Sequence, residues 1–167
     1  SFLSQSLLDD FEEGDLRREQ WVGSISDGTK TWHFPLKYKL YGVTPTTEEF
    51  SILFRLTEQY LIAAEAHAQL GDMDSALEYL NAVRHRANLP PVSNTEKEVV
   101  VDAVFQERRI EFFAEQGHRF FDLKRSGQID GVLNATKSQW DPTDVVLPIP
   151  ATELINNPNL LPQNEGY

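Results

Sequence analysis

The chain has 167 residues, enough for one domain with a hydrophobic core, and its 40% hydrophobic and 25% charged residues are ordinary for a globular protein. Its formal net charge of −11 disfavours binding to nucleic acid or anionic lipid, because an acidic surface repels phosphate. There is no cysteine, which excludes disulfides, thiol catalysis and cysteine metal sites, and no apolar run reaches the roughly 18 residues needed to span a membrane.

The first 45 residues show no sustained helical period. Four glycines and two prolines interrupt them, and the sequence HFPLKYKLYG at 33–42 is typical of short extended segments. We therefore predict a loop-rich segment over residues 1–45. This segment is also rich in aromatic side chains, among them Trp21, Trp32, Tyr38 and Tyr41.

Two helices joined by a tight turn are predicted next. The sequence TTEE offers a capping box with Thr46 as N-cap and Glu49 as N3, and Gly71 suits the position just after the first helix. Asp72 can then cap a second helix, which the sequence LPP ends near residue 89. The expected apolar faces are Leu53, Leu56, Tyr60, Ala63 and Ala64 on the first helix, and Ala76, Leu77, Leu80, Val83 and Ala87 on the second.

A third helix should begin with Thr95 as N-cap and extend to about Gln116, where Gly117 interrupts it. One or two further helical turns should follow from His118 to Arg125. Beyond residue 127 we expect irregular chain, with a short extended run at VVLPIP, a short helix at ATELINNP and an extended tail. The predicted fold class is mainly α: a tetratricopeptide-like helical hairpin plus further helices, with irregular loops and little β structure.

Glu107 and Glu111 lie one helical turn apart, on the same stripe as Val100 and Val104. One interpretation is a carboxylate pair for glycoside hydrolysis, and the other is a buried ion-pair network. We favour the network, because a glycosidase pair normally comes from different elements around a cleft. Its predicted members are Glu107, Arg108, Arg109, Glu111, Arg119 and Asp122, with Arg55, Arg84 and Arg86 as further partners, and Phe112, Phe113, Phe120 and Phe121 would fill the core around Gly117.

Loop aromatics are the candidate ligand-binding residues, since aromatic rings stack on sugar faces. The candidates are Trp140, Trp32, Trp21 and Tyr41, although each ring could equally close the edge of the core. No two of the four histidines are closer than 18 residues, and there is no HExxH motif, so no metal site is expected. There is also no P-loop, GxGxxG or GxSxG motif, so we expect no cofactor and find no support for catalysis.

Four blocks in the chain resemble, in order, the C-terminal portion of the SusD/RagB family of nutrient-binding lipoproteins from Bacteroidetes outer membranes. They are GDLRR with the KY of PLKYKLY, then RLTEQYLIAAEAHAQLGDMDSALEYLNAVRHRANLP, then ERRIEFFAEQGHRFFDLKRSG, and finally LPIPATELINNPNLLPQNEGY. Glu165 stands where a proline is common in the family. Because the chain begins with Ser, we expect it to be a piece of a longer protein.

The resemblance implies that residues 1–167 are the C-terminal part of one SusD-like domain, divided into 1–45, a helical scaffold at 46–126, and 127–167. It implies non-catalytic binding of an oligosaccharide or other nutrient, delivery to a SusC-like TonB-dependent transporter, and a lipid anchor at the cell surface that is not in this chain. The partners would be the ligand, the transporter and the N-terminal part of the same protein. The alternative is a tetratricopeptide-type protein–protein interaction module.

Overall fold

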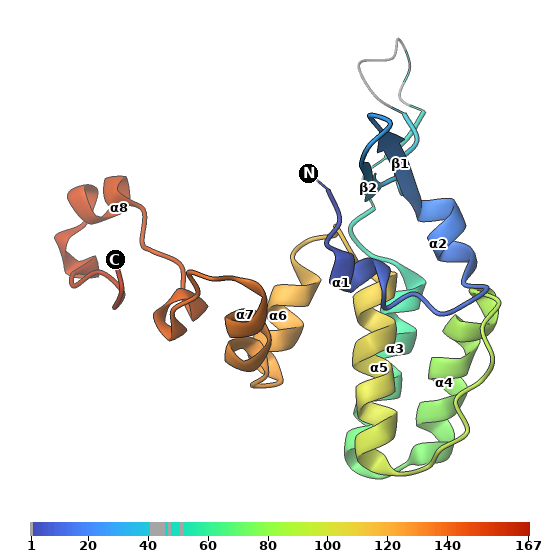
Figure 1. Ribbon diagram of the computed structural model, residues 1–167. Coiled ribbons are helices and arrows are strands. Elements are labelled where there is room, and N and C mark those ends of the chain that lie inside the picture. The colour runs from blue at the N-terminus through green and yellow to red at the C-terminus, as the bar shows by residue number, and fades with distance from the viewer. Residues whose placement is uncertain (1, 41–45, 47, 51) are drawn as a thin grey trace. The chain divides into compact units, whose positions relative to one another are not determined.

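The computed structural model describes residues 2–40, 46, 48–50 and 52–167 (Figure 1). Within these ranges the chain is mainly α, as predicted, with eight α-helices, one two-stranded sheet and two short 3-10 helices, η1 and η2. No helix in the described part of the chain is long and apolar enough to cross a bilayer. The elements in order are α1 (Gln5–Leu8), α2 (Leu16–Trp21), β1 (Val22–Ser26), β2 (Thr31–Pro35), α3 (Leu56–Leu70), α4 (Met73–Arg86), α5 (Lys97–Glu111), α6 (His118–Arg125), α7 (Ile129–Thr136), η1 (Pro142–Val145), α8 (Ala151–Asn156) and η2 (Pro158–Leu160).

The chain separates into two compact units, Ser1–His118 and Arg119–Tyr167. The first unit holds α1 to α5 and the β1–β2 hairpin, and the second holds α7, α8 and both 3-10 helices. The assignment of residues 1–167 to one domain, with subdivisions at 45 and 126, stays a prediction.

The helical hairpin is formed by α3 and α4, with α5 alongside both (Figure 1). Gly71 ends α3 in the left-handed region, with φ 87°, which glycine adopts without a steric penalty. Asp72 caps α4 through a hydrogen bond that its side chain accepts from the Ser75 N–H. Both predicted caps are therefore confirmed. The main core cluster joins the three helices and contains Leu61, Ala64, Leu80, Val83, Val104 and Phe112.

The predicted start of the first long helix is wrong. The α3 helix begins at Leu56, and its N-cap Arg55 makes no side-chain capping bond. Glu49 does not complete a capping box with Thr46, because its carboxylate accepts hydrogen bonds from the backbone N–H groups of Lys39 and Leu40. Leu53 and Leu56 are 67% and 72% exposed, so they do not belong to the buried face.

The α5 helix is also shorter than predicted. Its N-cap is Glu96 rather than Thr95, and it ends at Glu111 rather than near Gln116. Ala114 and Gln116 have positive φ angles of 59° and 31°, so the chain leaves the helical conformation before Gly117. The following helix, α6, confirms the expected turns from His118 to Arg125.

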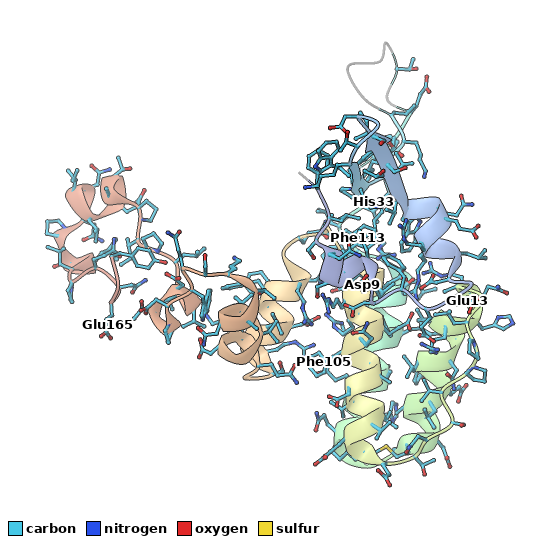
Figure 2. All side chains as sticks on the ribbon, in the orientation of Figure 1. Asp9, Glu13, His33, Phe105, Phe113 and Glu165 are labelled. Atoms are coloured by element: carbon cyan, nitrogen blue, oxygen red, sulfur yellow. The ribbon has the colours of Figure 1, made fainter. Side chains whose placement is uncertain are left out.

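The N-terminal segment contains two helices that the sequence pattern did not predict. The helices α1 and α2 have four and six residues, too short to establish a period, and each is capped by a side chain, Ser4 and Asp15 respectively. The β1 and β2 strands pair antiparallel, which confirms a short extended segment near 33–35. A second core cluster contains Leu7, Val22, Ile110 and Phe113, with Phe113 beside α1 (Figure 2).

The second unit has few buried side chains. Within Arg119–Tyr167 the buried residues are Asp122, Leu123 and Ile129. The α8 helix was predicted, whereas α7 falls where irregular chain was expected. Phe121 is 59% exposed and therefore does not fill the core, contrary to expectation.

Candidate functional site

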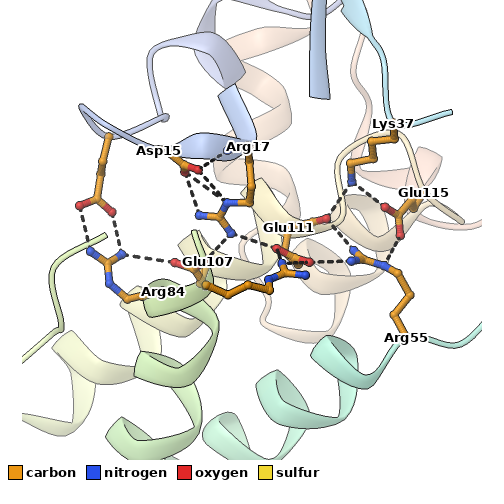
Figure 3. Close-up of polar contacts among 10 residues, drawn as sticks. Asp15, Arg17, Lys37, Arg55, Arg84, Glu107, Glu111 and Glu115 are labelled. Carbon is orange, nitrogen blue, oxygen red and sulfur yellow. Dashed lines mark hydrogen bonds and ion pairs between the residues drawn. The ribbon is translucent and has the colours of Figure 1, made fainter. Parts of the chain in front are cut away.

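The α5 helix carries four residues at helical spacing that face the interior of the first unit. Val100 and Val104 are fully buried, and the same stripe continues into Glu107 and Glu111, which are 2% and 0% exposed. Carboxylates this deeply buried require charged or hydrogen-bonding partners, because desolvation of an unpaired charge costs several kcal/mol. The side-chain partners of these two carboxylates come from three segments outside α5: α2, the chain just before α3, and α4 (Figure 3).

Glu111 accepts hydrogen bonds from three arginines. The Arg86 Nη2 group donates to both carboxylate oxygens at 2.6 and 2.7 Å. Arg55 Nη1 lies 2.6 Å from Oε1, and Arg17 Nη1 lies 3.0 Å from Oε2. Arg55 also donates from Nη2 to the Glu111 backbone carbonyl at 2.7 Å. Glu111 therefore links α2, the segment before α3, and the C-terminal end of α4.

Glu107 is shared by two arginines that have further carboxylate partners of their own. Arg17 Nη1 donates to Glu107 Oε1, and its Nη2 lies 2.8 Å from Asp15 Oδ2. Arg84 Nη1 lies 3.3 Å from Glu107 Oε2, and its guanidinium forms a two-bond fork with Glu12 at 2.7 and 2.9 Å. The paired charges thus continue from α5 to the chain just before α2.

Lys37 and Glu115 extend this arrangement on the side of Arg55. Lys37 Nζ lies 2.6 Å from Glu115 Oε1 and 2.7 Å from the carbonyl of Glu111, while Arg55 Nε lies 3.1 Å from Glu115 Oε2. The ammonium also lies over the Phe113 ring, 4.3 Å from its centroid. Burial lowers the pKa of Lys37 to about 8, against the opposing effect of Glu115. We call these residues the charge network: Glu12, Asp15, Arg17, Lys37, Arg55, Arg84, Arg86, Glu107, Glu111 and Glu115.

The two central carboxylates have pKa values shifted in opposite directions. Burial raises the pKa of Glu107 above its usual range, and Arg17 and Arg84 only partly offset that effect. Burial acts in the same direction on Glu111, but Arg86 and Arg55 outweigh it, so the pKa of Glu111 lies below its usual range. Opposite shifts are typical of an acid/base pair. Here, however, both carboxylates are at most 2% exposed and occupied by arginines, which leaves no room for a sugar between them.

The structure gives the other predicted network residues contacts as follows. Arg109 pairs with Asp10 and donates to Ser6 Oγ at 2.8 Å, on the side of α5 that faces α1. Arg108 lies over the Phe112 ring at 5.3 Å. Asp122 pairs with Arg125 at 2.7 Å in the second unit, to which Arg119 also belongs.

The charge argument from the sequence missed five members of the charge network: Glu12, Asp15, Arg17, Lys37 and Glu115. Three of them, Asp15, Arg17 and Lys37, fall in the blocks GDLRR and the KY of PLKYKLY, which carry the family resemblance. No local pattern of charge connects Arg17 to Glu107, because 90 residues separate them. The resemblance was the signal that singled out these positions, although it did not name their partners.

Trp32 and Trp140, like Trp21, are half-buried; Trp32 belongs to the first unit and Trp140 to the second. Trp140 is half-buried, and its indole N–H donates to Asp130 Oδ1 at 2.8 Å. Trp32 lies on β2, half-buried, with its ring centroid 6.0 Å from that of Phe2 and the Lys30 ammonium 5.6 Å above it. Both rings therefore retain accessible surface beside a polar group.

Trp21 is engaged more closely by its neighbours. Its ring lies within 6.4 Å of the Phe113 ring and under Lys37 at 4.7 Å. Arg55 and Arg86 lie at 5.9 and 5.8 Å, so this tryptophan borders the charge network. The remaining candidate, Tyr41, lies outside the described residues. Over the part of the chain that the structure describes, no cluster of three His, Asp or Glu side chains has the arrangement of a metal site.

Comparison with known proteins places these observations in a family. A model of the SusD family matches residues 16–167. SusD-like protein P38 of Formosa agariphila is 31% identical over 141 residues, which cover 78% of this chain and 27% of that relative. SusD-like protein P25 of the same organism is 35% identical over 130 residues, or 70% of this chain and 24% of that relative. The chain therefore spans about a quarter of the length of these curated relatives.

Solved structures give the same result for the fold. A SusD superfamily protein from Bacteroides vulgatus is 27% identical, with a TM-score of 0.78 over 99% of this chain and 44% of its own. The surface glycan-binding protein A from Bacteroides uniformis is 27% identical, with a TM-score of 0.68 over 96% of this chain and 40% of its own. Because the family model covers almost the whole sequence and the folds agree, this chain belongs to the SusD family.

Proposed function

We propose that the protein binds an oligosaccharide, or another nutrient, at the bacterial cell surface without breaking bonds in it. The observation that carries this proposal is the similarity to a solved surface glycan-binding protein, at a TM-score of 0.68 over 96% of this chain. Delivery of the ligand to a SusC-like TonB-dependent transporter, and attachment to the outer membrane through a lipid outside this chain, are part of the proposal.

A non-catalytic role is supported by the state of Glu107 and Glu111. A retaining or inverting glycosidase needs two carboxyl groups that flank the scissile bond and contact the sugar. Both carboxylates here are buried and bonded to arginines, and neither lines the two surface cavities near Tyr60 and Tyr38. We therefore propose that the charge network, with these two residues at its centre, supports the scaffold.

Aromatic rings with free surface are the proposed contacts for a sugar. A saccharide ring buries its C–H face against an indole, while its hydroxyls need polar groups at the edge. Trp140 has Asp130 at its N–H edge, and Trp32 has Lys30 above its ring. Trp21 is already covered in part by Lys37 and Phe113, which leaves it a smaller share of the proposed contact.

The experiment is a glycan array followed by calorimetric titration with the full product of the gene. We expect at least one saccharide to bind and no reducing sugar to be released from it. Trp140→Ala should weaken binding about tenfold or more, since loss of one stacking ring costs about 1–3 kcal/mol by analogy with base stacking. Trp140→Phe should weaken it less, because it keeps a ring face but loses the bond to Asp130.

Three results would decide against this proposal. Release of reducing sugar would favour catalysis. The absence of any saccharide ligand, together with retention of one specific protein from solubilised membranes, would favour the tetratricopeptide-type interaction module, which the α3–α4 hairpin supports. If Trp32→Ala and Trp140→Ala both bind the saccharide as tightly as the wild type, neither ring contacts it.

A further inference from the structure

A carboxylate lies at the edge of the Trp140 ring. Asp130, in the first turn of α7, accepts a hydrogen bond from the Trp140 indole N–H, with 2.8 Å between Nε1 and Oδ1. The Trp140 backbone N–H donates to the Lys137 carbonyl at 3.1 Å, so the chain turns just before the ring. The ring is half-buried and is restrained both by its own backbone and by the bond to Asp130. Its exposed surface therefore has a defined position beside the Asp130 carboxylate.

Asp130 keeps one carboxylate oxygen for a further partner. The residue is exposed, and its Oδ2 atom accepts no hydrogen bond from any residue that the structure describes. A carboxylate oxygen forms strong, charge-assisted hydrogen bonds with hydroxyl groups. An indole face packs against the C–H face of a sugar ring. Trp140 and Asp130 thus offer both kinds of contact that a saccharide makes, at one place on the surface.

Two further carboxylates lie within four residues of Trp140 along the chain. Asp141 follows it directly and accepts hydrogen bonds from the backbone N–H and the hydroxyl group of Thr143, at 2.9 and 2.6 Å. These bonds lower the pKa of Asp141, so its side chain is ionised at neutral pH. Asp144 accepts a hydrogen bond from the Asp141 backbone N–H at 3.0 Å. The chain next to the ring therefore carries negative charge that is held in place by local hydrogen bonds.

These aspartates differ from the carboxylates of the charge network, which meet arginine or lysine. In the part of the chain that the structure describes, no Lys or Arg side chain pairs with the three aspartates near Trp140. Arg125 pairs with Asp122, and the Lys124 ammonium donates to the Val145 carbonyl at 2.9 Å. Proteins normally bind carboxylate and sulfate groups through arginine or lysine, so an anionic ligand would be repelled at this ring. The basic side chains of this unit are Arg119, Lys124, Arg125 and the exposed Lys137.

We propose that Trp140 and Asp130 bind an uncharged saccharide and discriminate against glycans that carry uronic acid or sulfate groups. The indole face packs on the sugar ring, and Asp130 Oδ2 accepts a hydrogen bond from one of the sugar hydroxyls. An anionic substituent on the ligand is opposed by Asp130, Asp141 and Asp144. This inference rests on the proposed function, because it names the class of saccharide for one of the proposed contacts. It adds Asp130 as the residue that sets the preference.

A glycan array followed by calorimetric titration, both with the full product of the gene, tests this inference. The array holds neutral, uronate-containing and sulfated oligosaccharides. Each neutral saccharide that binds is then titrated beside its uronic acid counterpart, in which the C6 hydroxyl group is oxidised to a carboxylate. We expect the neutral form to bind about tenfold more tightly or better, because like charges oppose each other at a binding site. High salt should reduce this preference and leave the affinity for the neutral form nearly unchanged.

The substitution Asp130→Asn assigns the preference to one side chain. Asparagine retains an oxygen that accepts a hydrogen bond from the indole N–H, so the ring keeps its position while the charge is lost. We expect the affinity for the neutral form to fall several-fold, because the hydroxyl acceptor is no longer charged, and the preference over the uronic acid form to narrow. The matched control is Asp102→Asn on the exposed surface of α5, which should change neither affinity.

The outcomes separate this inference from the proposed function. Equal or tighter binding of the uronic acid form by the wild type, or an unchanged preference in Asp130→Asn, would overturn the inference and leave the proposed function standing. The absence of any saccharide ligand would contradict both. If Asp130→Asn prevents folding, the preference of the wild type and its salt dependence still decide.

Discussion

The unit Ser1–His118 buries several charged side chains together with many apolar ones, whereas Arg119–Tyr167 buries three residues, Asp122, Leu123 and Ile129. In the first unit, Glu111 and Arg17 are as well buried as the leucines of the core. In the second, Leu147 and Ile155 are 73% and 78% exposed. The difference indicates that the first unit provides most of its own stability, while the second relies on caps and local hydrogen bonds.

The same difference shows how a family can be recognised by buried residues that pair with one another. The block ERRIEFFAEQGHRFFDLKRSG includes Glu107 and Glu111, whose partners lie in the other blocks. Pairing between distant segments restricts these positions more than exposed positions, since an unpaired buried charge is costly. We infer that the recognisable blocks report the scaffold, whereas Trp140, one of the proposed sugar contacts, lies outside these blocks.

Glu111→Gln tests whether the buried charges stabilise the unit Ser1–His118, and it should have the largest effect. We expect it to lower the free energy of unfolding by about 3–5 kcal/mol, because three arginines lose a shared carboxylate inside the protein. Urea unfolding followed by circular dichroism measures the change. The control is Glu78→Gln on exposed α4 surface, which should change the value by no more than about 0.5 kcal/mol. A loss below about 1 kcal/mol for Glu111→Gln would mean that the network contributes little to stability.

Glu107→Gln should have a smaller effect, about 1–3 kcal/mol by the same measurement. Glutamine keeps an acceptor oxygen, Arg17 keeps Asp15 and Glu111, and Arg84 keeps its two bonds to Glu12. In Glu111→Gln, by contrast, Arg86 loses the one carboxylate with which the structure describes it paired. A larger loss for Glu107→Gln than for Glu111→Gln would reverse the order that the geometry implies.

The pH dependence of these two variants separates the residues by sign. Glu111 has a pKa below the ordinary 4.5, so its contribution to stability is present above 4.5 and is lost as the pH falls through the lower value. Glu107 has a raised pKa, so the part of its contribution that depends on protonation is present below 4.5 and is lost as the pH rises through the raised value. On acidification, Glu111→Gln should therefore lose stability less steeply than wild type, and Glu107→Gln more steeply. Parallel curves for the two variants would contradict the opposite pKa shifts.

The sequence predicts the helical hairpin well because its determinants are local. Gly71 and Asp72 make their capping hydrogen bonds within four residues of their own positions, and the helical periodicity predicted α4 correctly. The start of α3 was predicted wrongly because the Glu49 carboxylate accepts hydrogen bonds from the backbone N–H groups of Lys39 and Leu40. Capping patterns compare residues only three or four positions apart, so they do not include this contact. Likewise, the partners of Glu107 could not be assigned, since the contact with Arg17 depends on how α2 meets α5 in space. Local rules thus predict elements, and tertiary contacts decide where the elements end and which charges pair.

Leu147→Ala tests whether the exposed apolar side chains of the unit Arg119–Tyr167 contribute to stability, and it should have the smallest effect. The side chain is 73% exposed, so its removal from the 167-residue chain should change the free energy of unfolding by no more than about 0.5 kcal/mol. The matched control in the first unit is Leu80→Ala, which removes a fully buried side chain and should cost about 2–5 kcal/mol. Comparable losses for the two variants would mean that Leu147 is buried in solution. The second unit would then possess a core of its own, and the contrast between the two units would no longer hold.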